Sequence, residues 1–160
     1  MTPTRYQLRR ELHIPLPRDE VFAFFSDAAN LERITPNFLR FKILTPLPLE
    51  MKPGAIIDYE LRLFMIPFRW RTEITEYVPN EHFADVQVKG PYKVWDHRHE
   101  FRDAPDGGTI MTDTVNYDLL FGPLGRLAHA LMVKRSVRKI FDHRNATILD
   151  ILLHKGETVG

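Results

Sequence analysis

Two histidines one residue apart lie within GPYKVWDHRHEF, residues 90 to 101. Imidazole and carboxylate groups are the side chains that most often move protons near neutral pH or hold a metal ion. If this segment is a strand, successive side chains alternate between its two faces. His97 and His99 then share one face with Trp95 and Phe101, and the charged residues between them lie on the other. The flanking aromatic residues indicate that the histidine face is the buried one.

A carboxylate has the same orientation on the following strand. Asp113 has the parity of the apolar residues in this segment, which are Met111, Val115, Tyr117 and Leu119. The turn-forming sequence DAPDGG, residues 103 to 108, predicts a hairpin in which residues of equal parity face each other. Asp113 is therefore expected opposite His97 or His99, within cross-strand reach. Arg10, on the apolar face of the first predicted strand, is a competing partner.

The chemistry of this polar group has more than one interpretation. A buried carboxylate costs several kcal/mol of desolvation unless it is paired, so an Asp–His or Asp–Arg network within the core is expected. The same groups could serve as general acid and base on a bound carbonyl or polyketide-like compound. A zinc site would need Asp113 as third ligand beside His97 and His99. We predict no metal, no cofactor and no assigned catalytic residue.

Composition limits the classes of protein to which the chain can belong. Of its 160 residues, 44% are hydrophobic and 27% charged, which suits one domain over residues 1–160 with one sizeable core. A net charge of +1 provides no field that would attract nucleic acid, and no such partner is predicted. The lack of cysteine excludes disulfides and a cysteine nucleophile, and no G-x-S-x-G turn is present. We expect a soluble, cytoplasmic protein.

Hydrophobic periodicity predicts the order strand, two short helices, six strands and one long helix. Residues 6–14 alternate as a half-buried strand, and 17–27 and 27–34 are typical of short helices, with Asp27 as a cap. From 38 to about 120 the period is two. The predicted inward sets include Leu39, Phe41 and Ile43 in one strand, and Ala84, Val86 and Val88 in another.

The last segment, residues 122–153, has helical spacing and contains a single proline, at its start. A helix of about 30 residues would be roughly 45 Å long. A curved antiparallel sheet wrapped around this helix is the economical way to cover its apolar face. The predicted fold class is therefore α+β, with about seven strands around a long C-terminal helix.

This order of elements, together with VFAFFSDAANLERITP and the later run GPYKVWDHRHEF…GGTIMTDTVNYDL…FGPLGRLAH…IFDHR, resembles the SRPBCC superfamily. The resemblance covers nearly the whole chain. It implies the helix-grip fold shared by the birch-pollen allergen, START lipid-transfer domains and polyketide aromatase/cyclases. It is closest to bacterial single-domain ligand-binding members, which are related to a module that precedes an epimerase-like domain in longer chains. It also implies a deep cavity between the sheet and the long helix.

With that cavity, the inward side chains are expected to form an apolar pocket with a few polar anchors. The predicted ligand-binding residues are Arg10, Tyr59, Phe68, Trp70, Trp95, His97, His99, Phe101, Met111, Asp113 and Tyr117, with Val86 among the inward residues. For any one of the apolar residues, core packing is the alternative. The leading interpretation is binding of a small hydrophobic or amphipathic molecule, such as a lipid, isoprenoid or polyketide-like compound. An aromatase/cyclase or dehydratase-type enzyme and a protein-interaction module are the alternatives.

Two surface segments stand out. Residues 63–70, LFMIPFRW, place apolar side chains in a turn between two strands, where polar residues are usual. This turn is interpreted as a lid on the cavity, as a peripheral contact with a membrane, or as a segment folded onto its own core. Residues 119–127 could form the other lip. The basic run KRSVRK, residues 134–139, with His143 and Arg144 beyond it, is expected to be a solvated helix face. Nucleic-acid binding would require interleaved aromatics and a net basic domain, and neither is present.

Overall fold

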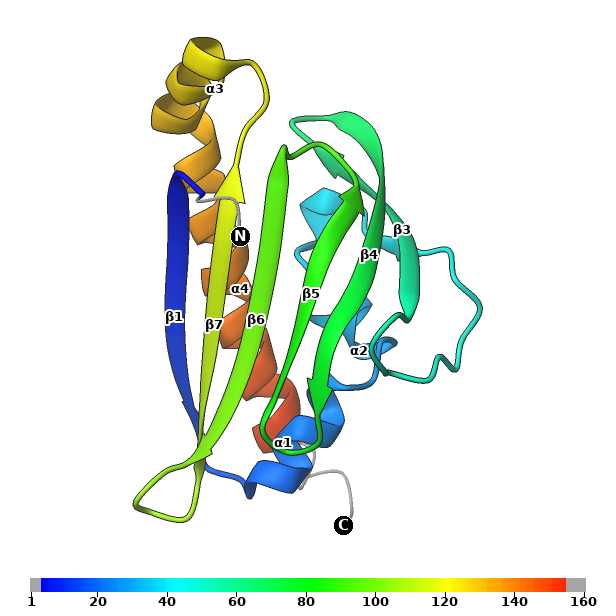
Figure 1. Ribbon diagram of the computed structural model, residues 1–160. Helices are drawn as coiled ribbons and strands as arrows, with labels where there is room; N and C mark the ends of the chain where they lie inside the picture. The colour runs from blue at the N-terminus through cyan, green and yellow to red at the C-terminus, as the bar shows by residue number, and fades with distance from the viewer. Residues whose placement is uncertain (1–3, 155–160) are drawn as a thin grey trace.

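A computed structural model describes residues 4–154 and contains one seven-stranded antiparallel sheet (Figure 1). The strands follow the spatial order β1-β7-β6-β5-β4-β3-β2. The long helix lies across one face of this sheet. The predicted order of elements and the fold class are confirmed. The strands are β1 (Tyr6–Ile14), β2 (Lys42–Ile43), β3 (Ile56–Leu63), β4 (Ile66–Val78), β5 (His82–Lys89), β6 (Val94–Asp103) and β7 (Thr109–Asp118).

The two predicted short helices follow β1. Helix α1 (Arg18–Phe25) begins after a proline, carries acidic residues in its first turn, and buries Val21, Phe22 and Phe25. Helix α2 (Asn30–Ile34) is shorter than predicted, and its N-cap is Ala29. The predicted cap, Asp27, instead accepts a hydrogen bond from the Ala29 backbone N–H at 3.0 Å, in the turn before the helix.

The predicted strand over residues 38–44 is mostly wrong. Residues Asn37–Leu39 form the short 3-10 helix η1, and only Lys42 and Ile43 pair with β3. Arg40 between them has φ of 47°, which no strand accommodates. Leu39 is buried nonetheless. The prediction that its side chain faces the core is therefore confirmed, although the segment is not a strand.

The predicted inward set of β5, Ala84, Val86 and Val88, has the wrong parity for the cavity. Phe83 and Asp85 lie in the cavity wall instead, and Val88 is 54% exposed. Ala84 is buried, as predicted, but lies outside the wall. The pairing of β4 with β5 contains two register shifts, between Arg71 and Thr72 and between Ile74 and Glu76. The shift between Ile74 and Glu76 lies on the β4 side, and β5 pairs continuously with β6 from His82 to Val86. The strand therefore alternates here, and the prediction fails because it assigned the valines to the inner face.

The C-terminal helix is one continuous rod with a wide turn in it. Helix α3 (Gly122–Ala128) passes through the π-helical turn η2 (His129–Val133) into α4 (Lys134–His154). The turn directs His129 inward, where its Nε2 lies 2.8 Å from the Tyr117 hydroxyl and its ring stacks on Tyr6. A π turn inside an α-helix re-aims side chains in this way.

Within residues 4–154, no helix combines the length and the apolar content needed to cross a bilayer.

Three buried clusters surround a shared space, and helix α4 contributes to two of them. Its Ile148 packs with α1 and the ends of β6 and β7, and its Val137 and Phe141 pack against β1 and β7. A third cluster, which includes Ile57 and Ile74, lies under β3 and β4. Residues from all three clusters form the wall of one cavity, so the core is divided and not solid.

Candidate functional site

The cavity lies between the inner face of the sheet and helices α2 and α4, and has a volume of about 160 Å³. Its wall is mainly aromatic and aliphatic. A few polar side chains interrupt this wall. Those contributed by the sheet and by α4 are Tyr59, Thr72, Asp85, His97, His99 and Arg144.

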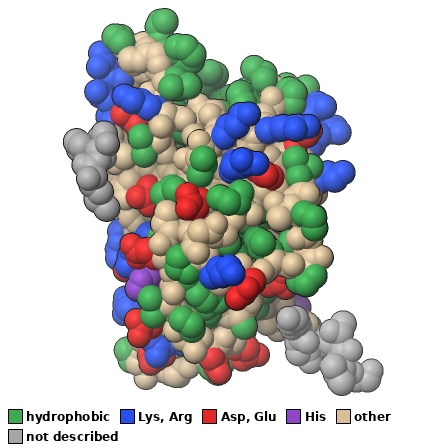
Figure 2. Space-filling view, turned by 45° about the vertical axis from the view of Figure 1, so that its right-hand side comes forward, with side chains coloured by type: hydrophobic (Ala, Val, Ile, Leu, Met, Phe, Trp, Pro, Cys, Tyr) green, Lys and Arg blue, Asp and Glu red, His purple; other side chains and the backbone are tan. Residues whose placement is uncertain are grey.

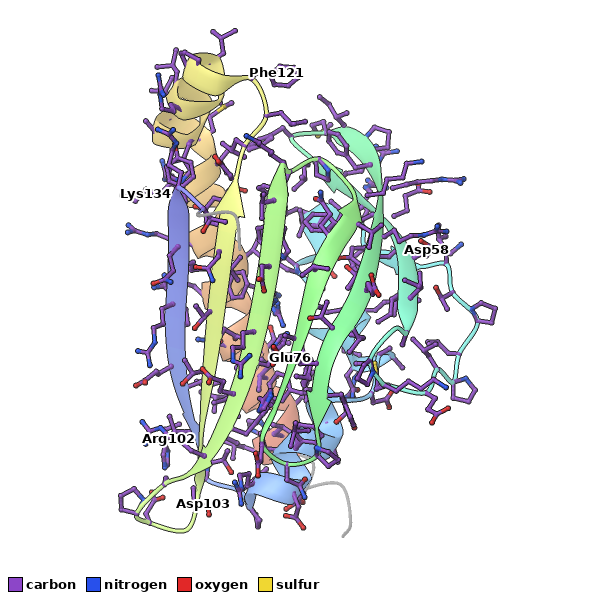
Figure 3. All side chains as sticks on the ribbon, viewed as in Figure 1. Asp58, Glu76, Arg102, Asp103, Phe121 and Lys134 are labelled. Atoms are coloured by element: carbon purple, nitrogen blue, oxygen red, sulfur yellow. The ribbon has the colours of Figure 1, made fainter. Side chains whose placement is uncertain are left out.

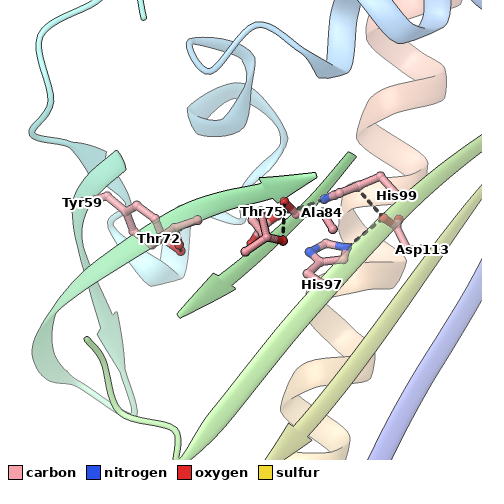
Figure 4. Close-up of polar contacts among 8 residues, drawn as sticks. Tyr59, Thr72, Thr75, Ala84, His97, His99 and Asp113 are labelled. Atoms are coloured by element: carbon pink, nitrogen blue, oxygen red, sulfur yellow. Dashed lines mark hydrogen bonds and ion pairs between the residues drawn. The ribbon is translucent and has the colours of Figure 1, made fainter. Parts of the chain in front are cut away.

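The two histidines of β6 meet the carboxylate of β7 behind this wall (Figure 4). Asp113 lies directly opposite His99 in the strand register, which confirms the predicted cross-strand placement. The Nε2 atom of His97 lies 2.9 Å from Asp113 Oδ1, and the Nδ1 atom of His99 lies 2.9 Å from the same oxygen. The His99 contact has the distance of an ion pair without the alignment of a hydrogen bond. One carboxylate therefore orients both imidazole rings.

Asp85 of β5 adds a second carboxylate. Its Oδ2 lies 3.3 Å from His99 Nε2, and its side chain is part of the cavity wall. His99 therefore stands between two carboxylates, Asp113 on one ring nitrogen and Asp85 on the other. Asp85 is absent from the predicted site because the predicted parity of β5 put its side chain on the outer face of the sheet. Phe83 has the same parity as Asp85 and, as a large apolar residue, indicates the correct inner face.

Burial and charge act in opposite directions on these groups. Burial lowers the pKa of both imidazoles, and for His97 it prevails together with the nearby charge of His99. For His99 the contacts with Asp113 and Asp85 outweigh burial and raise the pKa. Burial would raise the pKa of Asp113, but the contacts with both histidines hold it well below the ordinary value. These shifts favour the protonated form of His99, the neutral form of His97 and the ionised form of Asp113.

Arg144 reaches the same cavity from α4. It is 9% exposed, lies in the wall, and rests on the Phe141 ring at 5.0 Å from guanidinium carbon to ring centre. Among residues 4–154 it forms no ion pair, and its Nε atom has no hydrogen-bond partner. The prediction that Arg144 belongs to the solvated basic face of the helix is wrong, because its side chain is buried in the cavity wall. Helical spacing from Phe141 and Ile148 would have placed it near the buried stripe.

One end of the cavity is aromatic. Tyr59 and Trp70 stack at 5.7 Å, and Trp70 meets Trp95 edge-on at 5.5 Å. Tyr92 packs against both indoles. Within the described chain, the Trp70 indole Nε1 is buried without a hydrogen-bond partner. A buried indole N–H usually has a partner, so a bound polar atom would complete this site.

The predicted ligand-binding residues divide into two groups. Tyr59, Trp70, Trp95, His97 and His99 lie in the cavity wall. The wall does not include Arg10, Phe68, Phe101, Met111, Asp113 or Tyr117, nor the inward-predicted Val86.

The second group is displaced for identifiable reasons. Asp113 lies behind the imidazoles that it orients, and Phe101 and Met111 pack under α1 instead. Tyr117 is engaged by His129. Arg10 faces Asp113 in the register, but its guanidinium pairs with Asp142 of α4 at 3.4 Å. The predicted parity is correct for these five residues, but their side chains contact other parts of the inner face and not the cavity.

The polar set could also coordinate a metal ion. Asp85, His97 and His99 each offer one ligand atom, and these atoms lie within 4.8 Å of one another. The third ligand would be Asp85, and Asp113 would orient the two rings from behind, in the position of a carboxylate that supports metal-bound histidines. The predicted absence of a metal stays a prediction.

Comparisons with known proteins agree on the fold. The family described as polyketide cyclase / dehydrase and lipid transport matches residues 14–141. The Zhui aromatase/cyclase from Streptomyces sp. R1128 has 13% identity and a TM-score of 0.76, over 97% of this chain and 98% of its own. Ara h 8.0201 has 15% identity and a TM-score of 0.60, over 91% and 98%.

A third solved structure is longer than this chain. The nucleoside-diphosphate sugar epimerase from Corynebacterium glutamicum has 24% identity and a TM-score of 0.64, and the match covers 94% of this chain but 30% of the epimerase. No curated protein matches the sequence significantly. At these identities the structural matches establish the fold alone.

Proposed function

This chain belongs to the polyketide cyclase / dehydrase and lipid transport family, and from that premise we propose that it binds a small hydrophobic molecule carrying an acidic group. The apolar part of the ligand occupies the cavity between sheet and α4. Its acidic group pairs with Arg144, and Asp85, His97 and His99 bind adjoining polar atoms. The cytoplasm is the proposed location, and a small molecule is the proposed partner.

The unpaired Arg144 is the observation that carries this proposal. A buried guanidinium without a counter-charge is costly, and proteins keep such a group only where something compensates it. A carboxylate or phosphate matches the planar donors of arginine in geometry and charge. The Trp70 indole N–H, which also lacks a partner within residues 4–154, provides a second donor in the same wall.

The size of the cavity limits the ligand. A dry cavity of about 150 Å³ holds one benzene ring, so about 160 Å³ admits a single ring or a short chain without rearrangement. Apolar burial would supply about 25 cal/mol per Å² before the costs of association. A longer lipid or a polycyclic compound would need the walls to move apart.

Native mass spectrometry of the protein purified from cells provides the test. We expect a bound compound in the intact protein, released on denaturation and detected as an anion. Arg144→Met should remove it, whereas Arg138→Met, an exposed arginine on the same helix, should retain it. Arg144→Met should be at least as stable as the natural chain, since an uncompensated buried charge is lost.

Two results would contradict the proposal. One is a natural protein that carries no compound and is not stabilised by benzoate or by fatty acids of increasing length. The other is loss of folding in Arg144→Met, which would assign the guanidinium a structural role. A ligand at 100 times its dissociation constant adds about 2.7 kcal/mol to the free energy of unfolding, which thermal unfolding detects readily.

An enzyme of aromatase/cyclase or dehydratase type is the second candidate. The observation favouring it is His99 in the cavity wall between two carboxylates that raise its pKa, because an imidazole that keeps its proton can serve as a general acid toward a carbonyl oxygen. In that case His99→Gln should leave ligand affinity within a few-fold and abolish turnover of a bound polyketide-like carbonyl compound. Equal turnover in the variant and the natural protein would exclude this role.

A further inference from the structure

One end of the molecule carries large apolar side chains exposed to solvent. We define the apolar tip as seven exposed residues from two segments. Phe64, Met65 and Ile66 belong to the β3–β4 turn, and Phe121, Leu124, Leu127 and Leu131 belong to the segment that contains α3 and the start of η2. Met65 is 85% exposed and Phe121 is 79% exposed. Exposed apolar residues are normal when scattered, but a contiguous group marks a site of contact.

Both parts of the tip lie at the same end of the sheet. The start of β6 pairs with the end of β7, where Val94 faces Asp118, and α3 follows directly. The antiparallel order from β6 through β5 to β4 returns the β3–β4 turn to this same edge. The turn and α3 both stand at the upper end in Figure 1, and apolar side chains cover the two separate projections there in Figure 2.

The backbone of the tip holds apolar residues where other residue types are favoured. Phe64, Met65 and Phe121 have φ of 50°, 70° and 71°. Bulky residues are rare in this left-handed region, which suits glycine and asparagine. The strain positions three large side chains away from the core, and conformations of this cost cluster at functional surfaces.

The charged side chains within the two segments of the tip have one sign, and the acidic residues Glu60 and Asp118 border these segments. Residues 61–70 contain Arg62 and Arg69 and no acidic residue, and residues 119–135 contain Arg126, Lys134, Arg135 and no acidic residue. All five side chains are exposed, and within residues 4–154 none takes part in an ion pair. Apolar groups surrounded by unpaired cations match a surface that offers acyl chains below a layer of negative headgroups.

We propose that the apolar tip docks the protein on anionic phospholipid membranes. Phe121, Leu124 and Met65 insert at the boundary of headgroups and acyl chains, and the five cations contact lipid phosphates. Leu63 lies in the cavity wall and is followed directly by Phe64, so the docked end adjoins the cavity. This docking does not depend on the identity of the cavity ligand, and each proposal can fail without the other.

The same features weigh against a second copy of the chain as the occupant. A symmetric pair would bring the tip against itself and place five cations opposite five of the same sign. Such an interface would need acidic residues that residues 61–70 and 119–135 lack. Dimerisation is nevertheless an outcome that the test can register.

Co-sedimentation of the full chain with vesicles tests the proposal. We expect binding to vesicles containing phosphatidylglycerol, weaker binding to phosphatidylcholine alone, and loss of binding at high salt. Met65→Asn and Phe121→Asn suit the left-handed backbone and should fold normally. Each should weaken binding about tenfold. Leu153→Asn, which alters another exposed apolar residue near the end of α4, should not.

A charge reversal separates insertion from simple attraction. Arg126→Glu should lower binding to the anionic vesicles and leave the residual binding to phosphatidylcholine unchanged. Arg102→Glu, at the opposite end of the molecule in Figure 3, is the matched control and should bind as the natural chain does. Equal binding to both vesicle types, no binding at all, or a dimer in solution that Met65→Asn dissociates would overturn the proposal.

Discussion

Asp113 is 2% exposed and serves two imidazole rings at once, so the protonation of three residues is decided together. Its Oδ1 accepts a hydrogen bond from the Nε2–H group of His97, so the lowered pKa of that ring favours the neutral tautomer protonated on Nε2. His99 has a carboxylate near each nitrogen, which raises its pKa and favours its protonated form. The pKa values of these two histidines shift in opposite directions because Asp85 contacts His99 directly at 3.3 Å, whereas burial and the charge of His99 lower the pKa of His97.

Histidine titration followed by nuclear magnetic resonance should separate the two rings. His99 should titrate above its ordinary value of 6.5 and His97 below it. Because the folded-state pKa of His99 is raised, its contribution to stability is complete below about pH 6.5 and is lost as pH rises through the folded-state value. The lowered pKa of His97 costs stability as pH falls below 6.5. In Asp85→Asn, His99 should shift downward and His97 should move less.

The shared carboxylate also predicts a stability effect. Asp113→Ala leaves His99 charged and buried with one fewer counter-charge, so unfolding should become easier by about 3–5 kcal/mol. Asp113 has a lowered pKa, so its contribution is present above pH 3.8 and is lost as pH falls through the folded-state value. Asp113→Asn should therefore flatten the acid limb of the stability profile. Urea unfolding between pH 2 and 7 measures both, and an unchanged limb would contradict this role.

At the scale of elements, parity and turn composition were sufficient where the strands are regular. The β6–β7 hairpin follows the predicted register, which is why His99 and Asp113 meet as expected. Residues 38–44 could not be predicted in the same way, because the left-handed Arg40 interrupts the alternation. The outward prediction for Asp85 results from taking the parity of β5 from Val86 and Val88, whereas Phe83 on the same strand indicates the correct face. Arg144 was missed for another reason: its burial depends on how α4 rotates against the sheet, which local sequence does not determine.

The attachment of α4 to the sheet is predicted to depend on a few residues. Phe141 is 1% exposed and meets the His97 ring edge-on at 5.5 Å, and Ile148 is fully buried. Phe141→Ala should cost about 3–5 kcal/mol and Ile148→Ala about 2–5 kcal/mol of unfolding free energy. Leu153→Ala, at a position 44% exposed, should cost less than about 1 kcal/mol. Equal losses at all three positions would show that α4 is held by its ends.

At the scale of the whole molecule, the divided core departs from normal packing. Protein interiors are normally packed to crystal density, and empty space forfeits dispersion contacts. Here three clusters leave about 160 Å³ between them, with a charged residue directed into it. A space of this kind is consistent with a chain whose interior is completed by another molecule.

Filling the cavity should then separate stability from binding. Ala28 is 7% exposed and lies in the cavity wall, so Ala28→Phe can place a ring in the empty space. Where the space is available, filling it adds about 0.5–2 kcal/mol to the free energy of unfolding, whereas overpacking a solid core costs about 1–3 kcal/mol. We expect a gain in stability together with loss of the compound seen by native mass spectrometry. Ala104→Phe, at a buried position outside the wall, should destabilise the protein and leave the compound bound. If Ala28→Phe is destabilised as much as Ala104→Phe, the interior is already full and the cavity cannot be the binding site.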